Sequence, residues 1–252
     1  MKRNRESVFL KTFAMILFSA VTATTAQESN DLRLIDEFDP RAYCEALERR
    51  LDVLFSEATQ SNSNAIVVIA HGDRVVDTAV VHRRAVSYAT FRGFPADRYQ
   101  VLLTKRKGDI RVELWLGKNG KMPPITSTGL SLALPLEKRR VLFADDEIQL
   151  VTIDGHDTFI GTGNPSCSYW DDLKTIWDFL NANSAFDVEF RITTRSRRIF
   201  IHAVTILRRD FVENGAPMKR IKFVERRRGA ASEGTGGTYA GVVVSFVQRT
   251  RK

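Results

Sequence analysis

Two nine-residue stretches of this chain follow one pattern, Gly-x-Pro-x-x-Arg-apolar-x-apolar. They are GFPADRYQV (Gly93 to Val101) and GAPMKRIKF (Gly215 to Phe223). Glycine favours the end of a helix because it adopts the left-handed cap conformation, and proline prevents the helix from continuing. The arginine precedes a strand whose alternate side chains enter the core. Because each stretch ends an expected helix and opens an expected strand, the chain is predicted to contain an internal repeat.

The first copy of this pattern belongs to a β-α-β-α-β-β series. Apolar residues recur every three or four positions in the first expected helix, and AIVVIAHG is a near-continuous apolar run, typical of buried strands. A turn at Lys107-Gly108 predicts that the last two strands form a hairpin. The expected strands are 31–39, 65–72, 98–108 and 109–118, and the expected helices are 40–58 and 78–92.

The second copy belongs to a second series in the same order. Its expected strands are 147–157, 186–195, 220–228 and 239–249, and its expected helices are 169–182 and 199–214. The fold class expected is α+β, with two β-α-β-α-β-β domains, each a mixed sheet with two helices on one face. The predicted boundaries are 1–26 for a signal peptide, 27–122 for the first domain, 123–146 for a linker and lead-in strand, and 147–252 for the second domain.

The first 26 residues predict a secretory signal peptide. Lys2, Arg3 and Arg5 form a charged start, 13–21 an apolar centre and 24–26 a small-residue cleavage site. The apolar centre is shorter than the roughly 20 residues that a membrane-spanning helix needs. We therefore expect a periplasmic or otherwise exported protein, with no transmembrane segment in the mature chain.

The chain has two cysteines, Cys44 and Cys167. In an oxidising compartment they can form a disulfide that ties the two halves together. Both cysteines have apolar neighbours, so two buried and unpaired thiols are the alternative.

Four segments, in this order and in a chain expected to be exported, carry a resemblance to a known family. They are AIVVIAHGD, Arg83-Arg84-Ala85, RGFPADRYQV and VELWL. On these segments the first half resembles the OmpA C-terminal (OmpA/MotB-like) periplasmic domain over about Leu32 to Lys118. The resemblance is fainter over Glu147 to Arg249, which gives a second, degenerate copy. IDEFD and VELWL also fit a divergent single-domain version found in exported bacterial proteins.

The resemblance implies peptidoglycan binding. In that family an Asp after the second strand and an Arg in the second helix hold the ammonium and carboxylate of diaminopimelate. A zwitterion needs such an acceptor and a donor fork at its opposite ends. Asp73 stands at the Asp position, whereas the expected Arg position holds Val81, so Arg84, one turn further on, is the candidate partner. The second half has no Asp at the corresponding point.

Metal and enzymatic chemistry have weaker support. His71 and His82 are eleven residues apart, a spacing that matches no metal-site motif. No Gly-x-Ser-x-Gly occurs, and His202, at an apolar helix position, is expected to pack in the core. An envelope enzyme that uses a carboxylate pair of the glycosidase kind is a third, less favoured alternative, because such a pair has no fixed spacing in the sequence. We therefore expect no metal and no cofactor, and a protein that is not an enzyme.

Basic residues concentrate in the second half. Their clusters predict an anion patch for lipid head groups, lipopolysaccharide or glycan carboxylates; the alternative is a solvated face that protects strand edges. No nucleic-acid partner is expected, because aromatic residues do not alternate with the arginines. The function expected is a non-enzymatic envelope protein with weak or altered peptidoglycan binding, and the alternative is a structural or protein-interaction module that has lost glycan binding. The patch residues are Arg195, Arg197, Arg198, Arg226, Arg227 and Arg228.

Overall fold

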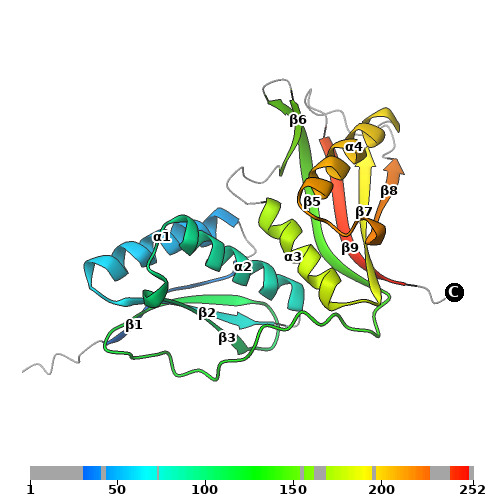
Figure 1. Ribbon diagram of the computed structural model, residues 1–252. Helices are drawn as coiled ribbons and strands as arrows, with labels where there is room; N and C mark the ends of the chain where they lie inside the picture. Colours follow the sequence, from blue (N-terminus) through cyan, green and yellow to red (C-terminus); the bar gives the residue numbers. More distant parts are fainter. Residues whose placement is uncertain are drawn as a thin grey trace, which may run out of the picture. The chain divides into compact units, whose positions relative to one another are not determined.

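Two mixed sheets follow each other along the chain, and each carries two helices on one face (Figure 1). The structure is a computed structural model in which the chain from Leu32 onward forms one compact unit. We call Leu32–Gly117 the first half and Arg140–Gln248 the second half. The structure describes residues 31–40, 44–72, 74–153, 156–161, 169–194, 197–227 and 239–249, with the backbone alone at 44–45, 144–153, 156–161, 169–172, 227 and 239–241.

The first sheet has the strand order β1-β4-β2-β3, in which only β2 and β3 run parallel. The predicted hairpin is wrong, because β4 follows β3 in the chain but pairs with β1 and β2. This position buries Val112, Leu114 and Leu116 at the centre of the sheet, each at most 4% exposed. The elements are β1 (Leu32–Phe38), α1 (Cys44–Gln60), β2 (Asn64–His71), α2 (Val75–Phe91), the 3-10 turn η1 (Ala96–Arg98), β3 (Tyr99–Lys105) and β4 (Arg111–Gly117).

The second sheet has the order β6-β5-β9-β7-β8, so that β5, β9, β7 and β8 repeat the order and orientations of β1, β4, β2 and β3. The single strand expected at 147–157 is two strands: β5 starts earlier, and β6 turns back on it with Ile153 opposite His156. The elements are β5 (Arg140–Ile153), β6 (His156–Gly161), α3 (Tyr169–Ala182), β7 (Phe186–Thr194), α4 (Arg197–Glu213), the 3-10 turn η2 (Met218–Arg220), β8 (Ile221–Arg227) and β9 (Tyr239–Gln248).

The two halves share their boundaries as well as their strand order. From the start of α2 at 75 to the end of β3 at 105, every boundary recurs 122 residues later, from the start of α4 at 197 to the end of β8 at 227. Over these 31 aligned positions only the Gly, Pro and Arg of the nine-residue pattern are identical. The shared geometry therefore depends on very few common residues.

The three common residues shape the passage from helix to strand. Gly93 and Gly215 both have positive φ, 63° and 70°, the left-handed conformation that closes a helix. The arginine of each copy donates to backbone carbonyls where the first helix of its half, α1 or α3, passes into the central strand. Arg98 donates to the carbonyls of Ala58 (2.8 Å) and Ser63 (2.7 Å). Arg220 does the same in the second half, to the carbonyls of Leu180, Asn183 and Phe186.

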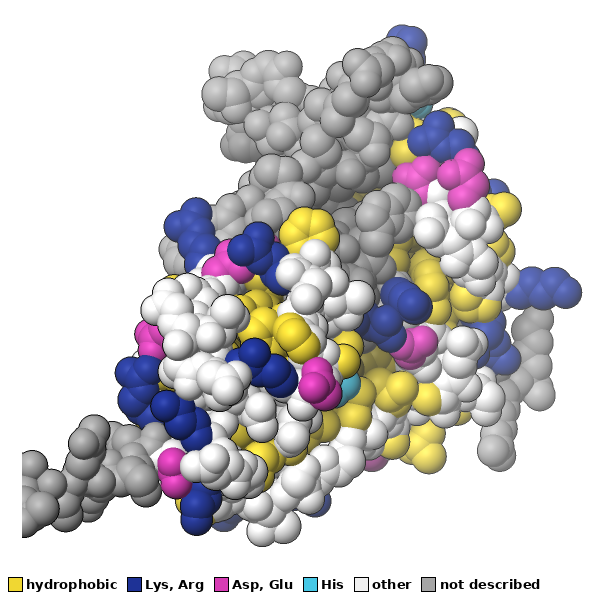
Figure 2. Space-filling view, turned by 60° about the vertical axis from the view of Figure 1, so that its left-hand side comes forward, with side chains coloured by type: hydrophobic (Ala, Val, Ile, Leu, Met, Phe, Trp, Pro, Cys, Tyr) yellow, Lys and Arg dark blue, Asp and Glu magenta, His cyan; other side chains and the backbone are white. Residues whose placement is uncertain are grey.

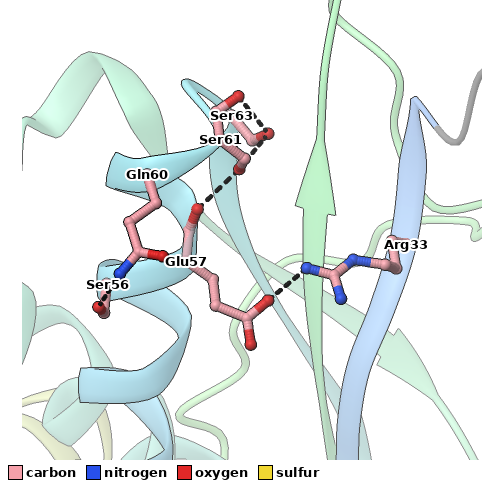
Figure 3. Close-up of polar contacts among 6 residues, drawn as sticks. All are labelled: Arg33, Ser56, Glu57, Gln60, Ser61 and Ser63. Atoms are coloured by element: carbon pink, nitrogen blue, oxygen red, sulfur yellow. Dashed lines mark hydrogen bonds and ion pairs between the residues drawn. The ribbon is translucent and has the colours of Figure 1, made fainter.

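Figure 3 shows the end of α1, the region that Arg98 binds. The Ser61 hydroxyl donates to the carbonyl of Glu57 and lies 2.8 Å from the hydroxyl of Ser63. The Glu57 side chain accepts from Arg33 of β1. The bonds from Ser61 to Glu57 and from Arg98 to Ala58 reach carbonyls of the last turn of α1, where a helix has fewer backbone donors of its own.

Each half has its own hydrophobic core on the helix-bearing face of its sheet. The first core is mainly aliphatic, and the second contains five fully buried phenylalanines. Val76 and Ala79 of α2 belong to the second core, so α2 packs against both halves. The five phenylalanines are Phe179, Phe186, Phe190, Phe211 and Phe246.

Candidate functional site

The end of β2 and the start of α2 form the region in which the sequence places the peptidoglycan site. Gly72 is tightly enclosed there, since a Cβ on it would lie 1.8 Å from the carbonyl oxygen of Gly108. His71 lies within hydrogen-bond distance (3.2 Å) of the Thr128 hydroxyl. Asp73, the predicted acceptor, lies outside the described residues.

Arg84, the predicted donor, lies partly buried on α2. It follows Val75, the first residue of that helix, by nine positions, which corresponds to about 13 Å along the helix axis. A long arginine side chain that leans toward the helix N-terminus can cover part of this distance. The clamp of Asp73 and Arg84 therefore stays a prediction.

A pocket of about 240 Å³ opens beside α2, between this helix, α3 and the segment that follows β4. We call it the seam pocket. Figure 2 shows yellow hydrophobic side chains among dark blue and magenta charged ones on the face that it draws. The pocket combines an apolar wall with hydroxyl, imidazole and charged groups. Its lining consists of Ala79, His82, Arg83, Val86, Ser87, Leu130, Leu132, Thr175 and Asp178.

Two opposite charges meet in the seam pocket. The Arg83 guanidinium donates to the carboxylate of Asp178 on α3, and the two side chains are 23% and 38% exposed. Burial lowers the pKa of His82, and the positive charge of Arg83 lowers it further. The imidazole is therefore neutral near pH 7 and is able to accept a hydrogen bond. The pair of Arg83 and Asp178 joins residues far apart in the sequence, and no local pattern in the sequence predicted it.

The predicted anion patch is divided between two faces of the second half. Arg197 pairs with Glu225 at 2.6 Å on the helix side of the sheet, and Arg198 is exposed on α4. Arg226 is the next residue of β8 after Glu225, so its side chain points to the opposite face. The patch is divided because successive side chains of a strand point to opposite faces of the sheet, so residues that are neighbours in the sequence lie on different surfaces. Arg195 and Arg228 lie outside the described residues, as does the side chain of Arg227.

The helix-free face of the second sheet carries a charged network that no pattern in the sequence predicted. Asp187 accepts from Lys222 (2.9 Å) and Arg249 (2.6 Å). Burial alone would raise the pKa of Asp187, but these two cations hold it below its usual value. The alternation in FDVEFRITT indicated the polar face, although not the partners on other strands.

Glu189, two residues further along β7, has the same kind of environment. It accepts from Arg140 and Arg191, each at 2.9 Å. The hydrogen bond from Arg140 lowers the pKa of Glu189, against the effect of burial. Both carboxylates are thus held in their charged form by cations on each side.

Three further expectations concern cysteine, histidine and metal chemistry. Cys167 and the side chain of Cys44 lie outside the described residues, so the disulfide stays a prediction. His202 is exposed rather than packed in the core, because the buried stripe of α4 runs through Ala203 and Ile206. Within the described part of the chain, no three His, Cys, Asp or Glu side chains gather as a metal site, and no helix is long and apolar enough to cross a membrane.

The chain matches no model of a known protein family, and no curated protein is significantly similar to it. Its function therefore has to be argued from the residues and their geometry.

Proposed function

We propose that this chain is an exported, non-enzymatic protein of the cell envelope that binds peptidoglycan, and that the seam pocket takes a zwitterionic group of its peptide. The signal-like start of the sequence supports export. The resemblance of the first half to the OmpA C-terminal domain supports the ligand class. The observation that carries the proposal is the pair of Arg83 and Asp178 in a pocket beside α2.

The chemistry of this pair suits a zwitterion. A ligand carboxylate can take the donor fork of Arg83 while a ligand ammonium takes the carboxylate of Asp178, so that both protein charges keep a partner. The neutral imidazole of His82 and the hydroxyl of Ser87 add polar contacts. A volume of about 240 Å³ is below the range of pockets for drug-sized molecules and suits a group the size of one amino acid.

The test is co-sedimentation of the chain with purified peptidoglycan. Wild type should sediment, free diaminopimelate should compete, and Arg83→Met with Asp178→Asn should weaken binding at least tenfold, since each lost charge-assisted hydrogen bond is worth about 1.5–3 kcal/mol. Arg92→Met is the matched control, because Arg92 also pairs with an aspartate, Asp52 at 2.8 Å, and does not line the pocket. Equal binding by wild type and the pocket variant would contradict the role of the pocket.

A second pair of substitutions separates the seam pocket from the clamp expected from the sequence. Asp73→Ala with Arg84→Ala should leave most of the binding if the seam pocket holds the ligand. Loss of binding in this variant alone would move the site to the start of α2.

The alternative function is a structural or protein-interaction module. One observation favours it: Val76 and Ala79 of α2 pack in the core of the second half, so that this face of the helix serves the internal contact. On this alternative, wild type does not sediment with peptidoglycan at all, and the chain binds a partner protein instead.

A further inference from the structure

One end of the second sheet brings together three segments that are distant in sequence. The chain enters β5 at the end of the sheet where it leaves β9 (Figure 1). The Gln248 amide donates to the carbonyl of Arg139 (2.9 Å), and the Gln248 side chain donates to the carbonyl of Leu136 (3.2 Å). The Arg249 amide donates to the carbonyl of Ala185 (2.8 Å), which links the start of β7 to the same end.

Six cations lie at this end of the sheet and on its helix-free face, and we call them the basic corner. Lys138 and Arg139 are exposed in the turn before β5, and neither has a carboxylate partner among the described side chains. The other four hold the two acids of β7. Three described carboxylates, those of Asp187, Glu189 and Glu137, lie in the same region, so the cations outnumber them. The basic corner consists of Lys138, Arg139, Arg140, Arg191, Lys222 and Arg249.

The cations form the outer layer of this surface. The side chains of Asp187 and Glu189 are only 10% and 12% exposed, whereas the four cations that pair with them are 36% to 58% exposed. The acids thus lie beneath the cations and fix their positions without covering them. A fixed cation loses less conformational entropy when it meets an anion than a free side chain does.

Exposed leucines accompany these charges. Leu136, in the turn beside Lys138, is 64% exposed, and Leu142 of β5 is 44% exposed. Leu142 pairs with Ser245, which pairs with Glu189, so that Leu142 lies on the same face as the charged network. Leucines beside lysine and arginine are typical of surfaces that lie on a bilayer, where apolar groups enter the boundary of the head groups.

We propose that the basic corner docks this protein on a bilayer that contains anionic phospholipids. The phosphates of the head groups pair with the outward nitrogens of the six cations, and Leu136 enters the layer beneath them. The exposed leucines favour a lipid surface over a soluble polyanion, which would leave them in water. This docking involves neither the seam pocket nor peptidoglycan.

The experiment is co-sedimentation of the full chain with vesicles of phosphatidylglycerol and phosphatidylcholine, compared with phosphatidylcholine alone. Each cation near an anionic surface contributes about a fivefold increase in binding, so Lys138→Gln with Arg139→Gln should weaken it roughly 25-fold. The control is Lys118→Gln with Lys121→Gln, which removes the same charge from the exposed loop that follows β4. Every variant keeps the same N-terminal residues, so their contribution cancels.

A second pair of variants tests the leucine. Leu136→Ser should weaken binding about tenfold, since the buried part of a leucine is lost, whereas Val212→Ser, at a residue 62% exposed on α4, should change nothing. Binding should also fall as salt rises, and soluble glycerol phosphate should not displace the vesicles. The proposal is overturned if the variant at Lys138 and Arg139 and the control at Lys118 and Lys121 lose the same amount of binding. It is also overturned if the chain binds both kinds of vesicle equally, or binds an acidic polysaccharide but not vesicles.

Discussion

The central strands of the two sheets, β2 and β7, occupy equivalent positions, but their helix-free faces differ in polarity. Ala65 of β2 pairs with the first residue of β3, and Val188 of β7 pairs with the first residue of β8, so Ala65 and Val188 are equivalent. The residues that follow them, Ile66 and Glu189, are therefore equivalent too, and both point to the helix-free face of their sheet. Ile66 is fully buried, whereas Glu189 belongs to a network of ions at the surface. One strand is therefore apolar on both faces, and the other is apolar on the helix side alone. The helix-bearing face and the Gly-Pro-Arg turn are what the halves share, and the other face varies.

The second helices of the two halves differ in the same way. Ala79 of α2 is buried between the halves, but its counterpart in α4, Ile201, is 53% exposed. Arg83, which pairs with Asp178, corresponds to the exposed Thr205. The surface of α2 that contacts the second half thus has an open equivalent on α4. The second helix of the first half therefore forms part of the contact between the halves, whereas the second helix of the second half leaves the same surface open.

An exchange between the two outer faces should give the largest effect. Ile66→Glu places a carboxylate without a partner at a fully buried site, which should destabilise the chain by about 4–5 kcal/mol. Glu189→Ile at the equivalent site should cost less than about 1 kcal/mol, since its partners Arg140 and Arg191 are 41% and 36% exposed. Urea unfolding gives both values. Similar losses in the two variants would show that the second outer face is buried in solution.

The two pattern arginines provide the next test. Arg220→Ala removes a guanidinium from three carbonyls and Arg98→Ala removes one from two, so we expect losses of about 4 and about 3 kcal/mol. Hydrogen exchange should show faster opening of the half that carries the substitution. A Lys replacement keeps the charge but not the fork, so it should recover only part of the loss. Full recovery by lysine would contradict the role of the geometry.

Local patterns in the sequence predicted most of the elements, and α3 has the expected bounds of 169–182. They did not predict the pairing of β4 and β9, because a strand that follows a tight turn need not pair with its neighbour when a distant apolar strand buries it better. The charges show the same limit. Arg83 and Asp178, and Asp187 and Arg249, come together only after two or more elements have packed. Spacing along the chain contains no signal for such pairs.

Acid should weaken the second half through Asp187 and Glu189. Both pKa values lie below the ordinary values of 3.8 and 4.5, so the stabilisation is complete above those values and is lost as the pH falls below about 4. The loss should be less than about 1 kcal/mol for each acid, because the partners are partly exposed. Urea midpoints from pH 7 to pH 3 should fall less for Asp187→Asn with Glu189→Gln than for wild type. The same slope in both proteins would place the acid sensitivity elsewhere in the chain.

The contact between Arg83 and Asp178 should have the smallest effect on stability, although it joins the two halves. Both side chains are partly exposed, and pairs of this kind contribute about 0.2–1 kcal/mol. A double-mutant cycle of Arg83→Met and Asp178→Asn should therefore give a coupling energy near 0.5 kcal/mol. A coupling above about 2 kcal/mol would identify the pair as a main element of the contact between halves. A small coupling together with a large loss of ligand binding is expected if the pair is kept for recognition, because the packing of Val76 and Ala79 already joins α2 to the second core.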